Sequence, residues 1–167
     1  MKILLTNDAG IHAVGLRSMY KALKSAGHEV FVVAPQAEQS AVGHAVTMAM
    51  PLKVKHFKEN GFEGRGVTGT PVDCVKLGLS HLLKDEGIEL VVSGLNAGAN
   101  VGPDILYSGT VAAATEAALL GSPAIACSVD DFNPADLTDQ GVYAAGLIER
   151  IPWPDLPLQC VINLNFP

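Results

Sequence analysis

The stretch Glu89–Asn100, ELVVSGLNAGAN, decides the fold class. Its first part, Glu89–Ser93, is a short apolar run typical of a strand that is buried on both faces. A glycine-rich loop, Gly94–Gly109, follows at once. Glycine and asparagine at this position are typical of a turn beyond the end of a core strand. The stretch therefore predicts a core strand that delivers a loop to one edge of a sheet.

The same pattern recurs on both sides of this stretch. Four further apolar runs are typical of buried strands: Lys2–Thr6, Glu29–Ala34, Pro123–Ser128 and Cys160–Asn165. Segments with helical spacing or a helix-start signal lie between them: 16–26, 70–82, 110–120 and 134–150. Strands that alternate with helices predict an α/β, Rossmann-like fold, in which helices cover both faces of a mainly parallel sheet.

One segment, Ala41–Gly69, breaks this alternation. Along part of it, every second residue belongs to one alternating series: Val46, Met48, Met50, Leu52, Val54 and His56. That period is typical of half-exposed strands. We therefore expect Ala41–Gly69 to form a small antiparallel flap inserted in a single domain that spans residues 1–167.

Length and composition narrow the class of protein. The 167 residues are enough for one domain with a full core, and 49% are hydrophobic while 17% are charged. The net charge of −6 disfavours a nucleic-acid polymer as a partner. No run is long and apolar enough for a membrane span, so we expect no membrane partner and a cytoplasmic location.

Three cysteines, Cys74, Cys127 and Cys160, lie far apart with no CxxC spacing. Each lies in an apolar run, so we expect buried, inert thiols in place of a disulfide or a zinc site.

Polar residues follow three of the predicted strands. They offer a carboxylate from Asp8, a hydroxyl from Ser40 and an amide oxygen from Asn96. Loops at the carboxyl ends of parallel strands converge, and hard oxygen donors suit Mg²⁺, Mn²⁺ or Ca²⁺. The three residues could equally cap turns, which is their usual role after a strand.

A second pattern, Tyr107–Thr110, opens a predicted helix. A helix start presents free N–H groups and the positive end of a dipole, and Ser108 and Thr110 add hydroxyl groups. Gly109 lets a ligand approach the backbone. The pattern is that of a phosphate site, although an ordinary Ser108 N-cap gives the same residues.

Three familiar site motifs are not found where their folds require them. The turn after the first strand lacks the GxGxxG spacing of dinucleotide-binding folds, and the chain contains neither a GxxxxGK[ST] loop nor a GxSxG elbow. A dinucleotide-dependent oxidoreductase is therefore disfavoured. An interaction domain with capped loops and no ligand is disfavoured by the polar residues at the predicted strand ends.

At this point the motifs resemble those of a known family, the SurE family of survival-protein nucleotidases. The similar segments run in order along the chain: Thr6–Ile11 (TNDAGI), Gly69–Val75 (GTPVDCV), Ser93–Gly102 (SGLNAGANVG), Tyr107–Ala113 (YSGTVAA) and Val161–Asn165 (VINLN). Together they cover essentially the whole chain.

The resemblance implies a divalent-metal-dependent phosphatase that hydrolyses nucleoside monophosphates, that is, a 5'/3'-nucleotidase. It implies that Asp8, Ser40 and Asn96 hold Mg²⁺ or Mn²⁺, and that Asp8 and Asn96 are catalytic. It also implies that the Ser108–Thr110 turn, together with Asn96, holds the phosphate of a small nucleotide substrate.

Three departures from the family pattern affect these expectations. Ala9 replaces a second aspartate that contacts the metal in the family, so we expect weakened or abolished turnover. Val14 replaces a usual proline. The family's C-terminal oligomerisation segment is not found before Pro167; where that segment is present, we expect a homodimer or tetramer.

Some expectations stay open. Asp104, just ahead of the phosphate turn, could contact a site residue from behind, donate a proton to the reaction, or be a solvated loop aspartate. His12 and His44 lie near the predicted site in sequence. Either could contact substrate, but solvent-facing loop roles are favoured for both. With Ala9 in place, the alternative function is a protein that binds nucleotide or phosphate without turnover.

Overall fold

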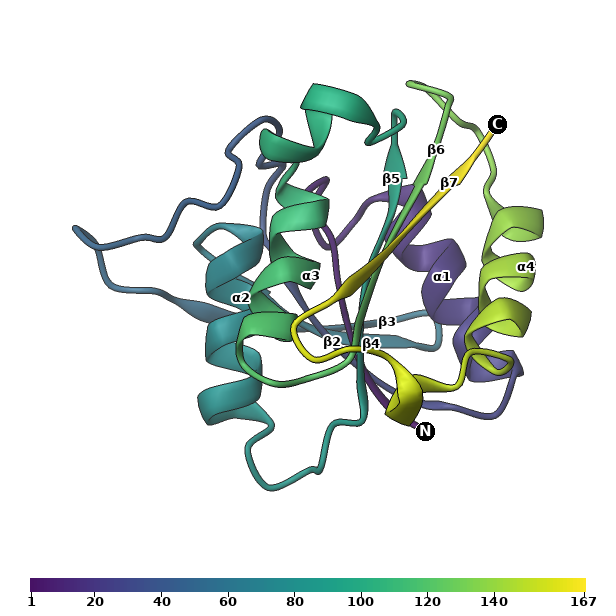
Figure 1. Ribbon diagram of the computed structural model, residues 1–167. Helices are drawn as coiled ribbons and strands as arrows, with labels where there is room; N and C mark the ends of the chain where they lie inside the picture. Colours follow the sequence, from purple (N-terminus) through teal and green to yellow (C-terminus); the bar gives the residue numbers. More distant parts are fainter.

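The computed structural model describes residues 1–167 as a seven-stranded sheet with helices on both faces (Figure 1). The strands are β1 (Lys2–Thr6), β2 (Glu29–Pro35), β3 (Val54–Glu59), β4 (Phe62–Val67), β5 (Leu90–Ala97), β6 (Ala124–Val129) and β7 (Val161–Phe166). The helices are α1 (Val14–Ser25), α2 (Pro71–Leu77), α3 (Gly109–Leu119) and α4 (Thr138–Ile148). The predicted α/β class with a mainly parallel sheet is confirmed.

The spatial order of the strands is β3-β4-β2-β1-β5-β6-β7, and every neighbouring pair is parallel except β3 with β4. β1 lies in the middle, because the chain builds the sheet outward from it in both directions. Ligands of such sheets bind beyond the carboxyl ends of the strands where the order reverses. The loops that follow β1 and β5 therefore meet at this edge.

Two apolar layers hold the sheet between its helices. Ile3 and Leu5 of β1 pack into the larger cluster, on the side of α1 and α4, whereas Leu4 packs into the cluster on the side of α2 and α3. In Figure 1 these two helix pairs flank the sheet on the right and on the left. This alternation is the period of two that a buried strand imposes.

The predicted antiparallel insertion exists, but most of its expected strand positions were wrong. The hairpin is formed by β3 and β4, with Glu59 opposite Phe62, while Val46–Met50 contains no strand. Asn60 and Gly61 adopt positive φ of 46° and 78°, as a tight two-residue hairpin turn requires, and so they set the register. β4 pairs with β2 in parallel, so the hairpin extends the main sheet.

The thiol prediction holds for two of the three cysteines. Cys74 and Cys127 are buried, and burial raises the pKa of both thiols, that of Cys127 to about 12. Cys160 is exposed, which contradicts the prediction, because it precedes β7 at the edge of the sheet. No helix in the chain has both the length and the apolar character that a membrane span needs.

α1 packs closely on β5 near the carboxyl end of this strand. β5 continues past the predicted end at Ser93, and its register with β6 shifts between Ser93 and Asn96. A Cβ atom added at Gly15 of α1 would overlap the carbonyl oxygen of Leu95. Only glycine lets the helix approach the strand backbone this closely.

We predict that Gly15→Ala lowers the free energy of unfolding by about 3 kcal/mol, because the methyl group forces α1 away from β5. Chemical denaturation measures this value. The matched control is Gly146→Ala in α4, where the nearest atom to the added Cβ is 4.0 Å away. Alanine there should be neutral or stabilising by up to about 1 kcal/mol. Equal effects at the two positions would contradict the packing account.

Candidate functional site

Asp8 lies in the loop after β1, against the first turn of α3. The side chain of Asn7 braces this loop, donating to the Gly10 carbonyl at 3.0 Å and accepting from the Gly10 N–H at 3.2 Å. The Thr110 hydroxyl donates to Asp8 Oδ1 at 2.9 Å. A Cβ on Gly109 would lie 2.9 Å from the Asp8 Cβ, so glycine is needed for this approach.

The Asp8 carboxylate is buried without a cationic partner. Only 6% of the residue is exposed, and none of the ion pairs in the protein includes it. Burial raises its pKa, against the opposing effect of hydrogen bonds from Thr110, and the nearby charge of Glu38 raises the pKa further. A buried, unpaired carboxylate is costly, and a bound cation would remove that cost.

The loop after β2 reaches Asp8 through its backbone. The Gln39 N–H donates to the Asp8 carbonyl at 2.8 Å. This contact lies one residue before Ser40 in the chain. Ser40 is exposed, and its hydroxyl donates to Glu38 at 2.5 Å. Glu38 was not predicted as part of the site, because its sequence position shows no more than a polar loop.

Asn96 stands near the end of β5, beside the loop that follows β1. The neighbouring residues Thr6 and Ser93 are paired in the β1–β5 register. The side chain of Asn96 is half-buried, and its NH₂ group donates to the Gly98 carbonyl at 2.7 Å. This contact leaves the amide oxygen free to accept or to coordinate.

The donor set fits a hard divalent cation. Asp8, Ser40 and Asn96 each retain oxygen lone pairs, since Ser40 and Asn96 use their hydrogens as donors. The protein has no group of three or more His, Cys, Asp or Glu side chains that could hold a metal ion. Carboxylate, hydroxyl and amide oxygens suit Mg²⁺, Mn²⁺ or Ca²⁺.

The predicted phosphate turn begins α3. Ser108 is the N-cap, and its hydroxyl oxygen accepts from the Val111 N–H at 3.1 Å. Ser108, Gly109 and Thr110 are buried, and the Thr110 N–H faces Asp8. The alternative N-cap role of Ser108 is therefore present. The N-cap hydrogen bond does not compete with anion binding, because the Ser108 hydroxyl proton and the Gly109 N–H remain available as donors.

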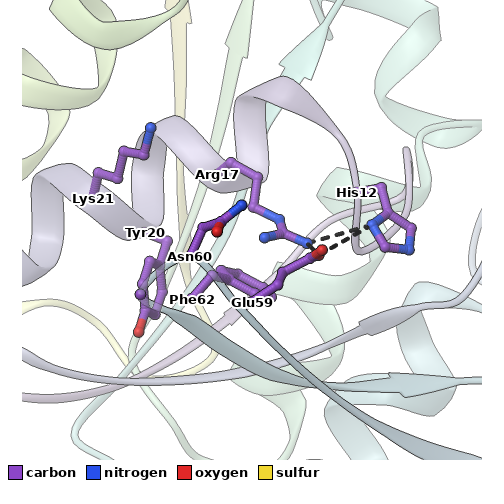
Figure 2. A pocket seen from close by; sticks show the side chains of 8 residues that line it. His12, Arg17, Tyr20, Lys21, Glu59, Asn60 and Phe62 are labelled. Atoms are coloured by element: carbon purple, nitrogen blue, oxygen red, sulfur yellow. Dashed lines mark hydrogen bonds and ion pairs between the residues drawn. The ribbon is translucent and has the colours of Figure 1, made fainter.

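His12 lies with a different group of side chains. It is 61% exposed, and its Nδ1 lies 3.7 Å from Glu59 and 3.4 Å from Arg17 (Figure 2). Arg17 itself pairs with Glu59 at 2.7 Å and stacks over Phe62. These contacts hold His12 on the β3–β4 hairpin side of α1.

Asp104 lies in the short 3₁₀ helix Gly102–Leu106. Its carbonyl accepts from the N–H groups of Tyr107 and Ser108, both at 3.1 Å, and its side chain is exposed with no hydrogen-bond partner. The backbone of Asp104 therefore shapes the entry to the phosphate turn.

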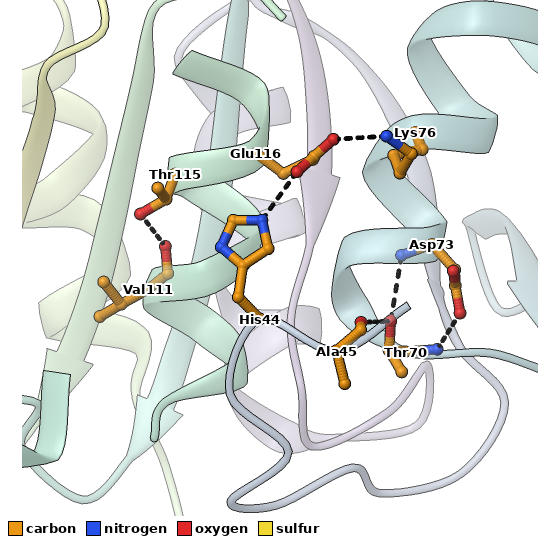
Figure 3. Close-up of polar contacts among 8 residues, drawn as sticks. All are labelled: His44, Ala45, Thr70, Asp73, Lys76, Val111, Thr115 and Glu116. Atoms are coloured by element: carbon orange, nitrogen blue, oxygen red, sulfur yellow. Dashed lines mark hydrogen bonds and ion pairs between the residues drawn. The ribbon is translucent and has the colours of Figure 1, made fainter. Parts of the chain in front are cut away.

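The segment 39–47, named the strap below, crosses from Asp8 to α3 and α2. Its contacts in order along the chain are Gln39 with Asp8, Gly43 with Tyr107, His44 with Glu116, Ala45 with Thr70 and Thr47 with Asp73. Figure 3 shows the contacts of His44, Ala45 and the α2 N-terminus. The sequence predicted strands here, and gave no sign of these anchors.

A polar network holds the glycine-rich loop after β5. Asn100 is buried and donates to Ser128 at 2.7 Å, while its backbone N–H donates to Asn165 at 2.8 Å. Asn163 donates to the Asn100 carbonyl at 2.9 Å. These roles were missed, although the alternation of Asn163 and Asn165 within an apolar strand could have indicated them.

Asp73 secures both the α2 N-terminus and the strap. It forms the predicted capping box with Thr70, and its carboxylate accepts from the Thr47 hydroxyl at 2.6 Å. Burial alone would raise the pKa of Asp73, but the hydrogen bonds from Thr47 and Thr70 outweigh burial and lower it.

We predict that Asp73→Asn lowers the free energy of unfolding by about 1–2 kcal/mol at pH 7. Because the pKa of Asp73 is lower in the folded protein, the carboxylate stabilises the fold above the ordinary pKa. That contribution is lost as the pH falls through the folded pKa, so the difference from the wild type should shrink below about pH 4. Denaturation at several pH values measures it. Asp85→Asn, at an exposed position, is the control and should change little. A pH-independent difference would contradict the account.

The sequence and the structure are similar to those of known proteins. The family described as "Survival protein SurE" matches residues 3–167. A protein named 5'-nucleotidase SurE from Nitratidesulfovibrio vulgaris (strain Miyazaki F) is 68% identical over the whole chain, which covers 62% of that relative. One of the same name from Solidesulfovibrio magneticus is 64% identical, with 65% of it covered.

A solved structure shows the same fold. The crystal structure of the SurE protein from Aquifex aeolicus matches with a TM-score of 0.84 and 34% identity, over 99% of this chain and 66% of that one. The chain thus spans less than two thirds of the length of the two relatives above. With the family matched over residues 3–167, this chain belongs to the SurE family of survival proteins.

Proposed function

We propose that the protein is a divalent-metal-dependent phosphatase that hydrolyses nucleoside monophosphates. The observation that carries the proposal is the buried Asp8 carboxylate, which lacks a cationic partner and lies against the start of α3. A cation and a phosphate are the two ligands that this arrangement suits. The relatives named 5'-nucleotidase SurE support the substrate class.

Each residue has a role that follows from its contacts. Asp8, Ser40 and Asn96 would hold the metal through oxygen atoms. When bound, a divalent cation would neutralise charge on the phosphate and lower the pKa of a coordinated water. The N–H of Gly109 and the Ser108 hydroxyl would orient the phosphoryl oxygens, which is the main task of a protein in phosphoryl transfer.

The Thr110 hydroxyl would fix the rotamer of Asp8. It donates to Oδ1, so Oδ2 is left as the oxygen for the metal. As the carboxylate among the three proposed ligands, Asp8 would also accept a proton from the attacking water.

Ala9 favours a second candidate, a protein that binds nucleotide without turnover. The site holds one carboxylate from the β1 loop where the SurE signature has two, and a lower negative charge weakens cation binding. Glu38, which lies near Asp8 and accepts from Ser40, partly restores this charge.

We predict that Ala9→Asp raises the rate of Mn²⁺-dependent phosphate release from AMP by about tenfold or more, equivalent to at least about 1.4 kcal/mol of transition-state stabilisation. Phosphate release is measured with and without EDTA, which should abolish it. The control is Asp8→Asn in the same background, which should remove the gain. Release that persists in EDTA, or that survives Asp8→Asn, would overturn the metal-dependent proposal.

Thermal shift distinguishes the two candidates in the unmodified chain. We expect AMP with Mn²⁺ to raise Tm, because a ligand that binds only the folded state stabilises it. A phosphatase releases phosphate during this experiment. A rise in Tm with no phosphate release favours the binding protein, and no rise in Tm with any nucleotide contradicts both candidates.

A further inference from the structure

The strap, residues 39–47, carries Ser40 between two backbone contacts. On one side Gln39 donates to the Asp8 carbonyl, and on the other Gly43 donates to the Tyr107 carbonyl at 2.9 Å. A Cβ at Gly43 would lie 3.2 Å from the Leu106 carbonyl, so the strap lies close against the segment that leads into the phosphate turn. The position of Ser40 therefore depends on how firmly the strap is held beyond Gly43.

Apolar burial does not hold the strap. Ala41, Ala45 and Val46 are exposed, and the chain that follows the strap is more exposed still, with Met48 at 87%. A segment with so little buried apolar surface opens easily unless polar contacts fix it. The anchors on α3 and α2 are therefore what keeps the strap in place.

The α3 anchor is an ionisable one. Glu116 is the single charged residue of α3, and it is 7% exposed. His44 Nε2 lies 2.7 Å from one of its carboxylate oxygens, and Lys76 of α2 donates to the other at 2.8 Å (Figure 3). Burial alone would raise the pKa of Glu116, but the hydrogen bonds from Lys76 and His44 outweigh burial and lower it.

The geometry gives Glu116 no role at the reacting atoms. It lies on α3 beyond the phosphate turn, and both of its carboxylate oxygens are used by His44 and Lys76. A buried carboxylate in a helix of small residues is costly unless its contacts repay it. Its contact with His44 connects α3 to the strap, whereas its contact with Lys76 connects α3 to α2.

We propose that His44 and Glu116 are positioning residues, which fix the strap and thereby place Ser40 beside Asp8. This proposal rests on the proposed metal site. Removing the contact should loosen the strap, weaken metal binding through Ser40 and leave the core of the sheet unchanged. The effect reaches the metal through one ligand, so it is smaller than the loss of that ligand.

The first experiment measures the strap alone. Amide hydrogen exchange at Gly43 and Thr47 is compared in wild type, His44→Gln, Glu116→Gln and the double variant. We expect exchange about tenfold faster in each single variant, and no additional increase in the double variant because both remove the same contact. Glu63→Gln is the matched control, since Glu63 forms only an exposed pair with Lys58.

The second experiment measures metal binding directly. Each protein is titrated with Mn²⁺, and the electron paramagnetic resonance signal of the free ion is followed. We expect dissociation constants about three- to tenfold higher in His44→Gln and Glu116→Gln. His44→Lys, which supplies an N–H donor to Glu116 from the same position, should restore most of the affinity. With AMP as substrate, the half-saturating Mn²⁺ concentration should rise while kcat at saturation stays within about twofold of the wild type.

The outcomes separate this proposal from the proposed function. Unchanged exchange, additive effects in the double variant, or faster exchange with unaltered Mn²⁺ affinity would each overturn the positioning role. If neither wild type nor any variant binds Mn²⁺, the proposed metal site fails, and the positioning role fails with it. A melting curve shows whether Glu116→Gln still unfolds cooperatively. If it does not, the test rests on His44→Gln alone, because His44 is exposed and its substitution should not disturb the core.

Discussion

The site depends on one buried charge. Asp8 is placed in the protein interior against the first turn of α3, where Thr110 donates to it and Gly109 leaves room for it. The positive end of a helix dipole and a few hydrogen bonds stabilise a carboxylate only partly, as its raised pKa shows. A bound cation would balance the charge, and this is the role that the proposed metal site gives it.

The loops at this edge of the sheet are held by polar contacts in place of apolar packing. Asn7 braces the loop after β1, and Asn100 joins the loop after β5 to the last two strands. These side chains are buried and hydrogen-bonded, which makes the loops rigid at positions where backbone groups must face a ligand. The strap is different, because it is exposed and depends on the anchors at Glu116 and Asp73.

The fold could be predicted from sequence where local pattern and tertiary position agree. Apolar runs such as Lys2–Thr6 are buried strands because both faces of a parallel sheet are covered. The insertion was harder, because alternation at Val46–Met50 competed with the true hairpin. β4 contains two glycines that weaken its apolar signal, although the Asn60-Gly61 turn was visible. Chance alternation in an exposed segment cannot be distinguished from a strand without knowing what packs on it.

The candidate site could be predicted only in part for the same reason. Strand ends pointed to Asp8 and Asn96 as candidates, but the contact of Asp8 with Thr110 joins residues 102 positions apart.

The proposed metal site requires that Asp8, Ser40 and Asn96 share one cation. Crystals soaked in Mn²⁺ test it most directly, through the anomalous diffraction of the metal. We expect one strong peak within coordination distance of all three oxygen atoms. A peak elsewhere, or none at a saturating Mn²⁺ concentration, would contradict the proposed metal site.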